Sequence, residues 1–286
     1  MKQAEQIFVY DSTNKQFRKE TFNPAKHRPQ IQKSKNIVIK AGSKVLTRED
    51  NGLDNKVIAE LSRQMSELHY QGINITYVTS GSITTGMGIA GMKEKPTETG
   101  TLQVLSSIGQ AELMHVYKRY FTDTYGITIG QILLEDYDIK PQQKAFFENT
   151  RQLRIIPICN ANDPTYTGEV GKDNDGLAGK IAKLTEADLL ILLTEREGLY
   201  KENPRANNAQ LIGFVNGVDT ELIELKKDQR SATGIGKGGI NSKLTIPQQS
   251  NYTGNWIIAN GKRPNILLDI LKGNNVGTYI VNRQKV

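Results

Sequence analysis

Residues 188–194 read DLLILLT, a run of five aliphatic side chains between an aspartate and a threonine. A strand with one face in water alternates apolar and polar residues, whereas a strand covered on both faces is apolar throughout. The run therefore predicts a central strand in a sheet that has helices on both sides. Sheets of this kind belong to α/β domains, in which most strands are parallel.

Outward from this strand, apolar segments of strand length alternate with amphipathic segments of helical period. We predict strands over 36–42, 75–79, 127–134, 155–160, 209–215, 255–261 and 277–281. We predict helices over 53–72, 101–124, 141–153 and 177–186, after Val218 and from Ile240. This alternation predicts a three-layer αβα sandwich around an open, mostly parallel sheet. Ligands of such sheets bind beyond the carboxyl ends of the strands.

Residues 1–36 differ from this pattern, and we interpret them as an N-terminal arm beside a main domain over 37–286. QIFVYD (6–11) and QFRKETF (16–22) flank STNK, which predicts a short β-hairpin. The polar, proline-containing NPAKHRPQIQKSK follows, and its composition is typical of a connecting segment.

The composition is that of a soluble, cytoplasmic protein. No window approaches the roughly 18 apolar residues of a membrane span, and the N-terminus lacks the pattern of a secretory signal. The single cysteine, Cys159, excludes an internal disulfide. The net charge of +7 favours anionic partners such as nucleotides or carboxylates. Because the basic residues are spread out and no nucleic-acid-binding motif occurs, we expect neither a nucleic-acid nor a membrane partner.

The ends of the predicted strands carry groups that suit anions. KAGS (40–43) ends one strand, where Lys40 could bind a phosphate beside a glycine that lets backbone amides approach. The alternative is a surface lysine that keeps its ammonium group in water. TSGS (79–82) ends the next strand and could form a second anion pocket. Ser80 and Ser82 could equally cap the helix that follows.

The segment 155–180 is rich in polar side chains. It carries Asn160, Asn162, Asp163, Asp173, Asn174 and Asp175 around a loop that enters a helix. These groups could hold a substrate ammonium, a magnesium ion or a catalytic lysine, but Asn, Asp, Gly and Pro are also ordinary turn residues. After DLLILLT, Thr194 and Glu195 could contact a base or ribose, or could lead the strand into a turn.

GIGKGGINSK (234–243) opens with the pattern G-x-G-x-x-G. A dinucleotide-binding turn must follow a strand directly, whereas this loop follows ELKKDQRSAT (224–233), which is polar and charged. The dinucleotide interpretation therefore fails on its context. Lys237 and Lys243 stand in and after a glycine run just before a predicted helix, which indicates a phosphate clamp.

Five stretches in this order resemble the motifs of the amino acid kinase family, over roughly Asn36 to the C-terminus. They are IVIKAGSKVLT (37–47), VTSGSITTGM (78–87), IPICNANDPTYTGEVGKDNDGLAG (156–179), LLILLTEREGLYKENPR (189–205) and GIGKGGINSK (234–243). Five motifs in the right order match more specifically than any one of them. The resemblance implies an acceptor-binding half over about 37–175 and a nucleotide-binding half over about 176–286.

The resemblance also implies roles for individual residues. Lys40 and Lys243 would bind the transferring phosphoryl group, and Asp175 would orient both lysines as the third catalytic residue. The amino acid substrate would contact Ser80, Gly81, Asp163 and Asn174. ATP would contact Lys40, Gly42, Ser43, Thr194, Glu195, Lys237, Gly238, Gly239, Ile240, Asn241, Ser242 and Lys243.

Within the family, the motifs are most similar to those of members that phosphorylate the γ-carboxylate of L-glutamate. This implies transfer from ATP, with Mg²⁺ bound mainly through the ATP phosphates and no metal site of the protein's own. The product would be glutamyl 5-phosphate, the first intermediate toward proline. A carboxylate is already ionised near neutral pH, so no histidine base is needed. The resemblance further implies a homo-oligomer, a dimer or tetramer, that lacks the RNA-binding-like C-terminal PUA domain of many bacterial relatives.

The sequence departs from the family pattern at a few positions. Ala161 stands where glutamate-phosphorylating members usually have Glu, and Glu195 replaces an Asp. Lys237 and Ile240 alter a Gly-Gly-Met pattern. Ala161 leaves open another amino acid or carboxylate as the acceptor. A non-catalytic, nucleotide-binding regulatory protein with the same fold is the remaining alternative.

Overall fold

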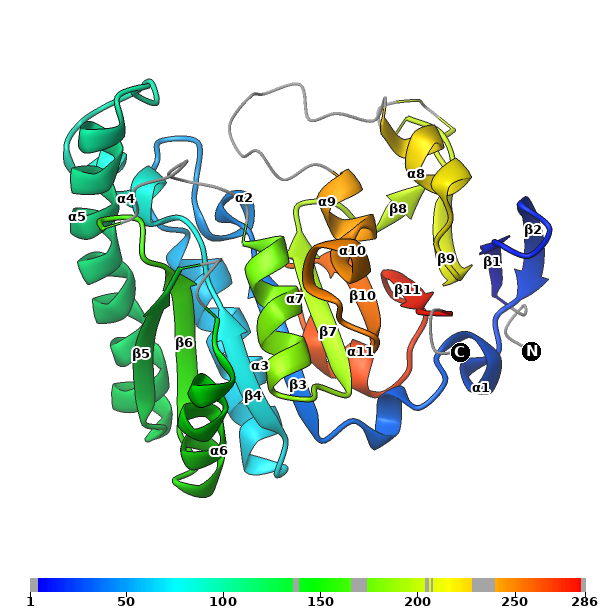
Figure 1. The fold of residues 1–286 in the computed structure, drawn as a ribbon, viewed down its shortest axis with the longest axis horizontal. Coiled ribbons are helices and arrows are strands. Elements are labelled where there is room, and N and C mark those ends of the chain that lie inside the picture. Colours follow the sequence, from blue (N-terminus) through cyan, green and yellow to red (C-terminus); the bar gives the residue numbers. More distant parts are fainter. Residues whose placement is uncertain are drawn as a thin grey trace.

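The computed structural model describes residues 5–135, 139–165, 174–203, 206, 208–227 and 240–283, which form one large sheet between two helix layers (Figure 1). The strands are β1 (Gln6–Asp11), β2 (Gln16–Thr21), β3 (Asn36–Ala41), β4 (Asn74–Val78), β5 (Ile129–Leu134), β6 (Ile156–Ala161), β7 (Leu189–Thr194), β8 (Leu199–Tyr200), β9 (Leu211–Asn216), β10 (Asn255–Asn260) and β11 (Thr278–Val281). The α-helices are α1 (Pro24–His27), α2 (Ser43–Leu46), α3 (Asn55–Tyr70), α4 (Ser82–Ile89), α5 (Thr99–Tyr117), α6 (Lys144–Gln152), α7 (Asp175–Leu184), α8 (Thr220–Lys227), α9 (Ile240–Leu244), α10 (Ile246–Ser250) and α11 (Ile266–Leu271). Shorter helical segments are the 3₁₀ helices η1 (Ile31–Lys33) and η4 (Pro141–Gln143), and the π-helix η2 (Lys118–Thr124).

The strands follow the order β2-β1-β9-β11-β10-β7-β3-β4-β6-β5, and β8 pairs with β9. β7 lies between β10 and β3 and is parallel to both. Its side chains divide between two apolar clusters on opposite faces of the sheet: Leu189, Ile191 and Leu193 join one, and Leu190 and Leu192 join the other. DLLILLT is therefore a central strand covered on both faces, as predicted.

Each apolar cluster is covered by its own layer of helices. The first contains side chains of α3, α5 and α11, and the second contains side chains of α6, α7, α8, α9 and α10. The antiparallel pairs are β1–β2, β10–β11 and β8–β9, and the other pairings between named strands are parallel. The predicted three-layer αβα sandwich with a mostly parallel sheet is confirmed.

The predicted helices are present with small changes at their ends. The helix expected over 53–72 is α3, and the carboxylate of Asp54 accepts the backbone N–H of Val57 at its start. Gly72 follows its end with a φ of 83°, a conformation that favours glycine. The helix expected over 101–124 is α5, continued by η2 in π geometry. Among the described residues, no helix has the length and apolarity that crossing a membrane requires.

The hairpin expected near the N-terminus is formed by β1 and β2. β1 also pairs in parallel with β9, so the hairpin forms one edge of the main sheet. Arg28 anchors the chain beyond it, because its buried guanidinium donates to the carbonyl oxygens of Gly213 at 2.9 Å and Val276 at 3.1 Å. Burial lowers the pKa of Arg28 to about 10, so the group is still charged at neutral pH.

Glycines allow α4 and α5 to pack closely at the other end of the sheet. A Cβ on Gly109 would lie 1.8 Å from the carbonyl oxygen of Ser82, and a Cβ on Gly86 would lie 1.9 Å from that of Leu105. No larger residue fits at such distances. The contact places α5 beside the carboxyl ends of β4 and β6, where two of its polar side chains reach the candidate site described below.

Candidate active site

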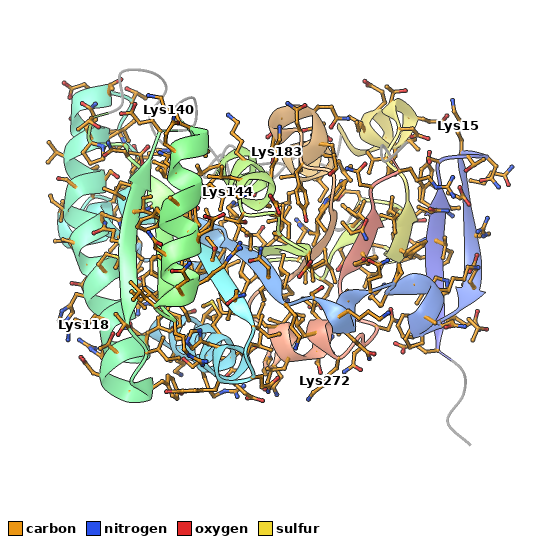
Figure 2. All side chains as sticks on the ribbon, turned by 60° about the horizontal axis from the view of Figure 1, so that its bottom comes forward. Lys15, Lys118, Lys140, Lys144, Lys183 and Lys272 are labelled. Carbon is orange, nitrogen blue, oxygen red and sulfur yellow. The ribbon has the colours of Figure 1, made fainter. Side chains whose placement is uncertain are left out.

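Lys40 and Lys243 are buried, unlike the lysines at the surface. Lys118, Lys183 and Lys272 project from the edges of the molecule in Figure 2. Lys40 is the last residue but one of β3 and is only 2% exposed. Lys243 in α9 is 7% exposed. The interpretation of Lys40 as a surface lysine with its ammonium group in water is therefore wrong.

Asp175 joins the two lysines. It is the first residue of α7 and is fully buried. The Nζ of Lys40 lies 2.8 Å from its Oδ1, and the Nζ of Lys243 lies 2.7 Å from its Oδ2. The hydroxyl of Ser242 donates to the same Oδ2 at 2.8 Å. One carboxylate thus connects the end of β3 with α9 at the start of α7, and the structure brings together the three residues that the sequence assigns to catalysis.

The charges of this cluster favour an anion. The two ammonium groups and the one carboxylate together carry a single positive charge, and burial strengthens its field because little water screens it. The N-terminus of α7 adds the positive end of a helix dipole at the same place. A phosphoryl group, with ionised oxygens that accept N–H bonds, suits such an environment.

Asn174 ties three elements together beside this cluster. Its Nδ2 donates to the carbonyl oxygen of Thr79 after β4 and to Oδ1 of Asn160 in β6, at 2.8 Å each. The hydroxyl of Ser80 lies 3.3 Å from the same nitrogen. Although Asn174 precedes α7, its side chain makes no capping bond to that helix. Its amide is used instead to hold the strand ends and the start of α7 in one place.

Two side chains of α5 extend the hydrogen-bond network around Asn160, and the sequence motifs did not identify them. The hydroxyl of Ser106 donates to the carboxylate of Asp163 at 3.3 Å, and Oε1 of Gln110 accepts from Asn160 at 2.7 Å. Both are buried, and the Nε2 of Gln110 has no hydrogen-bond partner among the described residues. The sequence pattern that could have identified them is two polar residues, four positions apart, on the apolar face of a predicted helix.

Gly81 gives the turn between β4 and α4 its shape. Its φ of 97° lies in the left-handed region, which favours glycine. α4 begins at Ser82, and no side chain caps it, so the interpretation of Ser80 or Ser82 as a helix cap is wrong. The hydroxyl of Ser82 instead lies within hydrogen-bond distance of the hydroxyl of Ser106, at 3.0 Å.

Comparison with known proteins identifies the fold around this site. Residues 35–246 match the amino acid kinase family. The chain belongs to the amino acid kinase family. It is 38% identical over 253 residues to a glutamate 5-kinase of Clostridium tetani, which covers 86% of this chain and 94% of the relative. A glutamate 5-kinase of Salmonella arizonae is 38% identical over 255 residues, which is 86% of this chain and 68% of the relative.

Solved structures of other kinases share the fold. A UMP kinase of Ureaplasma parvum superposes with a TM-score of 0.60 at 16% identity, over 87% of this chain and 99% of that one. An isopentenyl phosphate kinase of T. acidophilum gives a TM-score of 0.59 at 16% identity, over 85% of this chain and 99% of that one. At such low identity these likenesses concern the fold alone.

The residues expected to contact the nucleotide lie at the ends of β7 and β3, beside the ends of β4 and β6 on the expected acceptor side. Thr194 ends β7, and its carbonyl oxygen accepts the backbone N–H of Gly261 at 2.9 Å. The carboxylate of Glu195 lies 3.8 Å from the ammonium group of Lys44, and both side chains are partly exposed. Gly42 and Ser43 lead from β3 into α2 close by, since the N–H of Gly42 bonds to the carbonyl of Leu193 at 3.3 Å.

The glycine-rich loop is only partly described. Ile240, Asn241 and Ser242 form the start of α9, so the helix predicted from Ile240 is confirmed. Lys237, Gly238 and Gly239 lie outside the described residues, and so does Asp173.

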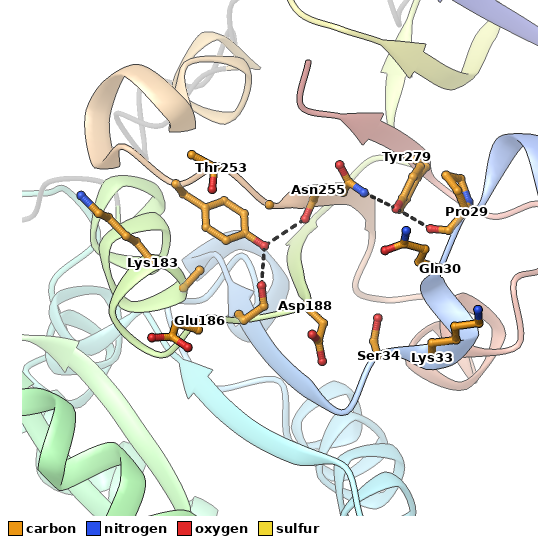
Figure 3. A pocket seen from close by; sticks show the side chains of 14 residues that line it. Pro29, Gln30, Lys33, Ser34, Lys183, Glu186, Asp188, Thr253, Asn255 and Tyr279 are labelled. Carbon is orange, nitrogen blue, oxygen red and sulfur yellow. Dashed lines mark hydrogen bonds between the residues drawn. The ribbon is translucent and has the colours of Figure 1, made fainter. Parts of the chain in front are cut away.

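A pocket of about 350 Å³ lies at the opposite, amino edge of the sheet (Figure 3). Gln30 and Lys33 of the N-terminal segment form one side, and Lys183 and Asp188 near the start of β7 form the other. None of its described lining residues belongs to the Lys40–Asp175–Lys243 cluster. The pocket is therefore separate from the candidate active site.

Proposed function

We propose that this amino acid kinase transfers the γ-phosphoryl group of ATP to the γ-carboxylate of L-glutamate, which gives glutamyl 5-phosphate and ADP. The observation that carries the proposal is the buried carboxylate of Asp175, which holds the ammonium groups of Lys40 and Lys243 at 2.8 and 2.7 Å. Identity of 38% to glutamate 5-kinases supports glutamate as the acceptor and the first step of proline biosynthesis as the role.

The cluster suits phosphoryl transfer because this reaction needs positioning and positive charge rather than a base. The attacking carboxylate is ionised at neutral pH. One of its oxygens would bond to the γ-phosphorus while the bond from that phosphorus to ADP breaks. Lys40 and Lys243 would stabilise the charge on the equatorial oxygens, and Asp175 would keep both ammonium groups in place.

Mg²⁺, when bound with ATP, would neutralise charge on the β- and γ-phosphates. Among the described residues, no three His, Cys, Asp or Glu side chains gather in a way that could hold a metal ion. The donor set of the cluster, with two ammonium groups around one carboxylate, suits phosphate oxygens. We therefore assign Mg²⁺ mainly to the ATP phosphates.

The acceptor would lie against the ends of β4 and β6. Asp163 has a buried carboxylate that could pair with the substrate ammonium group, and Asn174, Ser80 and the backbone of Gly81 would contact the substrate oxygens. Gln110 joins this set, because its buried Nε2 is a hydrogen-bond donor that a substrate carboxylate could use. On the nucleotide side, Gly42, Ser43, Thr194, Glu195, Ile240, Asn241 and Ser242 would contact ATP.

A second acceptor is favoured by one position. Ala161 ends β6 next to the Asn160 amide network, and its side chain is only a methyl group. This leaves room and removes a charge relative to the glutamate that the family motif usually has there. Another amino acid or carboxylate is therefore the second candidate, with the same chemistry.

The experiment is ATP- and Mg²⁺-dependent formation of hydroxamate, in which hydroxylamine traps an acyl phosphate. L-glutamate is compared with aspartate, N-acetylglutamate and other carboxylates. A strong signal with glutamate alone supports the proposal, and a signal with another acid moves the substrate but keeps the mechanism. No signal from folded protein that binds ATP would overturn it and favour a non-catalytic regulatory protein. We also propose that the protein is cytoplasmic and forms a dimer or tetramer. Light scattering would test the oligomeric state.

A further inference from the structure

The N-terminal hairpin lies outside the matched family region, which begins at residue 35, yet β1 pairs with β9, and the hairpin contributes to the apolar cluster that α9 covers. Tyr10 is the residue that makes this contact. It lies near the end of β1 and is fully buried. Its hydroxyl donates to both carboxylate oxygens of Asp219, at 3.0 and 2.9 Å. Burial and the Asp219 carboxylate raise the pKa of Tyr10, so the hydroxyl keeps its proton at neutral pH.

Asp219 determines how α8 begins. Its Oδ1 accepts the backbone N–H of Leu222 at 2.8 Å, and its carbonyl accepts that of Ile223 at 3.2 Å. A carboxylate in this position satisfies an N–H group that the first turn of a helix leaves without a partner. Tyr10 therefore orients the group that starts α8. Without its hydroxyl, the carboxylate could turn toward water.

α8 in turn packs against α9, the helix that holds Lys243, and both belong to the same helix layer, in the upper part of Figure 1. Leu222 of α8 and Leu244 of α9 are both fully buried, and they share one apolar cluster with Tyr10 and Trp256. The indole N–H of Trp256 donates to the carbonyl oxygen of Lys243 at 3.0 Å. A continuous series of described contacts therefore leads from Tyr10 to Lys243.

We propose that Tyr10 is a positioning residue for phosphoryl transfer, which acts on Lys243 through Asp219 and α8. The inference rests on the proposed function and extends it to a hairpin outside the family match. An ammonium group stabilises the transferring phosphoryl group only at the correct distance, so a small shift of α9 lowers the rate. The contribution is electrostatic and geometric, and Tyr10 itself contacts no reacting atom.

The test is Tyr10→Phe, which keeps the ring in the apolar cluster and removes only the hydroxyl. We expect kcat/KM for ATP to fall about tenfold, because a misplaced catalytic group can cost about a hundredfold. The KM for the acceptor should stay within about twofold, since Asp163 is bound by Ser106 of α5 and Asn174 is bound to the carbonyl oxygen of Thr79. Asp219→Ser keeps an oxygen for the N–H of Leu222 but is too short to reach Tyr10, so it should reproduce the loss. The double variant should be no worse than either single one.

Tyr279→Phe is the matched control. Its hydroxyl donates to the carbonyl oxygen of Pro29 and accepts from Asn255, at 2.9 Å each, as drawn in Figure 3. It too is a buried tyrosine that binds the N-terminal segment to the sheet, but it belongs to the apolar cluster on the opposite face of the sheet from Tyr10. We expect a similar fall in melting temperature with kinetic constants within about twofold of the wild type.

Trp256 supplies a readout that a merely structural role would not move. It is the only tryptophan of the chain, so its emission reports on the bond to the Lys243 carbonyl. Tyr10→Phe should shift this emission, and Tyr279→Phe should leave it unchanged.

If both variants lose stability alike and neither changes emission or kcat/KM for ATP, the inference is overturned. Absence of any hydroxamate from the wild type would overturn the proposed function instead, and Trp256 emission would then still decide the link between Tyr10 and Lys243.

Discussion

Lys40 and Lys243 share one carboxylate: their ammonium groups lie 2.8 and 2.7 Å from the two oxygens of Asp175. The lysines come from opposite halves of the chain, one from β3 and the other from α9. Because Asp175 starts α7, its position is fixed by a helix rather than by a loop. The distance between the two ammonium groups is therefore set by the fold before any nucleotide binds.

Asp175→Asn should remove both activity and stability. The substitution leaves two buried ammonium groups without the charge that compensates them, and breaking a buried ion pair costs about 3–5 kcal/mol. Urea unfolding measures the change, and hydroxamate formation should fall at least about a hundredfold. The control is Asp50→Asn, which breaks an exposed pair with Arg48 and should leave the free energy of unfolding almost unchanged. Equal stability of the two variants would show that Asp175 does not compensate the lysines.

Lys243→Ala should abolish turnover and leave the fold intact. The remaining pair of Lys40 and Asp175 is neutral, so no buried charge is left without a partner of opposite sign. We expect kcat to fall by a factor of about 10² to 10⁴, because one of the two cations proposed to stabilise the transferring group is lost. Lys183→Ala, at an exposed position of α7, is the control and should keep full activity. Turnover that survives in Lys243→Ala would contradict the assignment of this lysine.

Gly109→Ala should destabilise the protein, whereas Gly100→Ala should not. Both glycines lie in α5, but a Cβ at Gly109 would meet the backbone of Ser82 at 1.8 Å, while at Gly100 the nearest atom is a side-chain oxygen of Glu98 at 3.8 Å. Alanine in a helix is favoured over glycine by roughly 0.5–1 kcal/mol, so Gly100→Ala should be neutral or stabilising. Thermal unfolding of the two variants measures the difference. If Gly109→Ala melts at the wild-type temperature, α4 and α5 do not pack as described.

Stability in acid should depend on Glu20 of the hairpin. Burial alone would raise its pKa, but bonds from Lys26, Arg18 and His27 outweigh this and lower the pKa of Glu20 to about 2. A carboxylate with a lowered pKa stabilises the fold above its ordinary pKa of 4.5, and this contribution is lost as the pH falls toward about 2. Glu20→Gln should therefore be less stable than the wild type at pH 6, and the gap should close between pH 4.5 and about 2.

Chemical unfolding as a function of pH measures this gap. Glu94→Gln, at an exposed position, should match the wild type throughout. A gap between the wild type and Glu20→Gln that stays constant down to pH 2 would mean that the ion pairs of Glu20 do not stabilise the folded state.

Local patterns in the sequence predict most helices and strands, because periodicity and turn residues act within a few positions. The central strand β7, the helix α3 and the hairpin of β1 and β2 are examples. The pairing of β1 with β9 was not predicted, since parallel pairing between segments about two hundred residues apart leaves no local pattern. The same holds for the antiparallel direction of β11 beside β10.

The site was predictable where its residues lie in motifs at strand ends. Lys40, Asp175 and Lys243 are brought together by the fold, and Asn174 and Asp163 contact Asn160 and Ser106 on the proposed acceptor side. Ser106 and Gln110 were not predicted as site residues because they lie inside a helix. The role of a polar residue on the buried face of a helix can be inferred only once its neighbours are known. The role of Tyr10 was not predicted because its partner, Asp219, is far away in the sequence.

The most direct test of the central claim follows an oxygen atom. L-glutamate labelled with ¹⁸O in its γ-carboxylate is incubated with the protein, ATP and Mg²⁺, and hydroxylamine then releases phosphate from the acyl product. If the γ-carboxylate attacks the γ-phosphorus beside Lys40 and Lys243, the bridging oxygen leaves with the phosphate, which carries one ¹⁸O. Phosphate without ¹⁸O would mean that water attacks ATP, and would contradict the account.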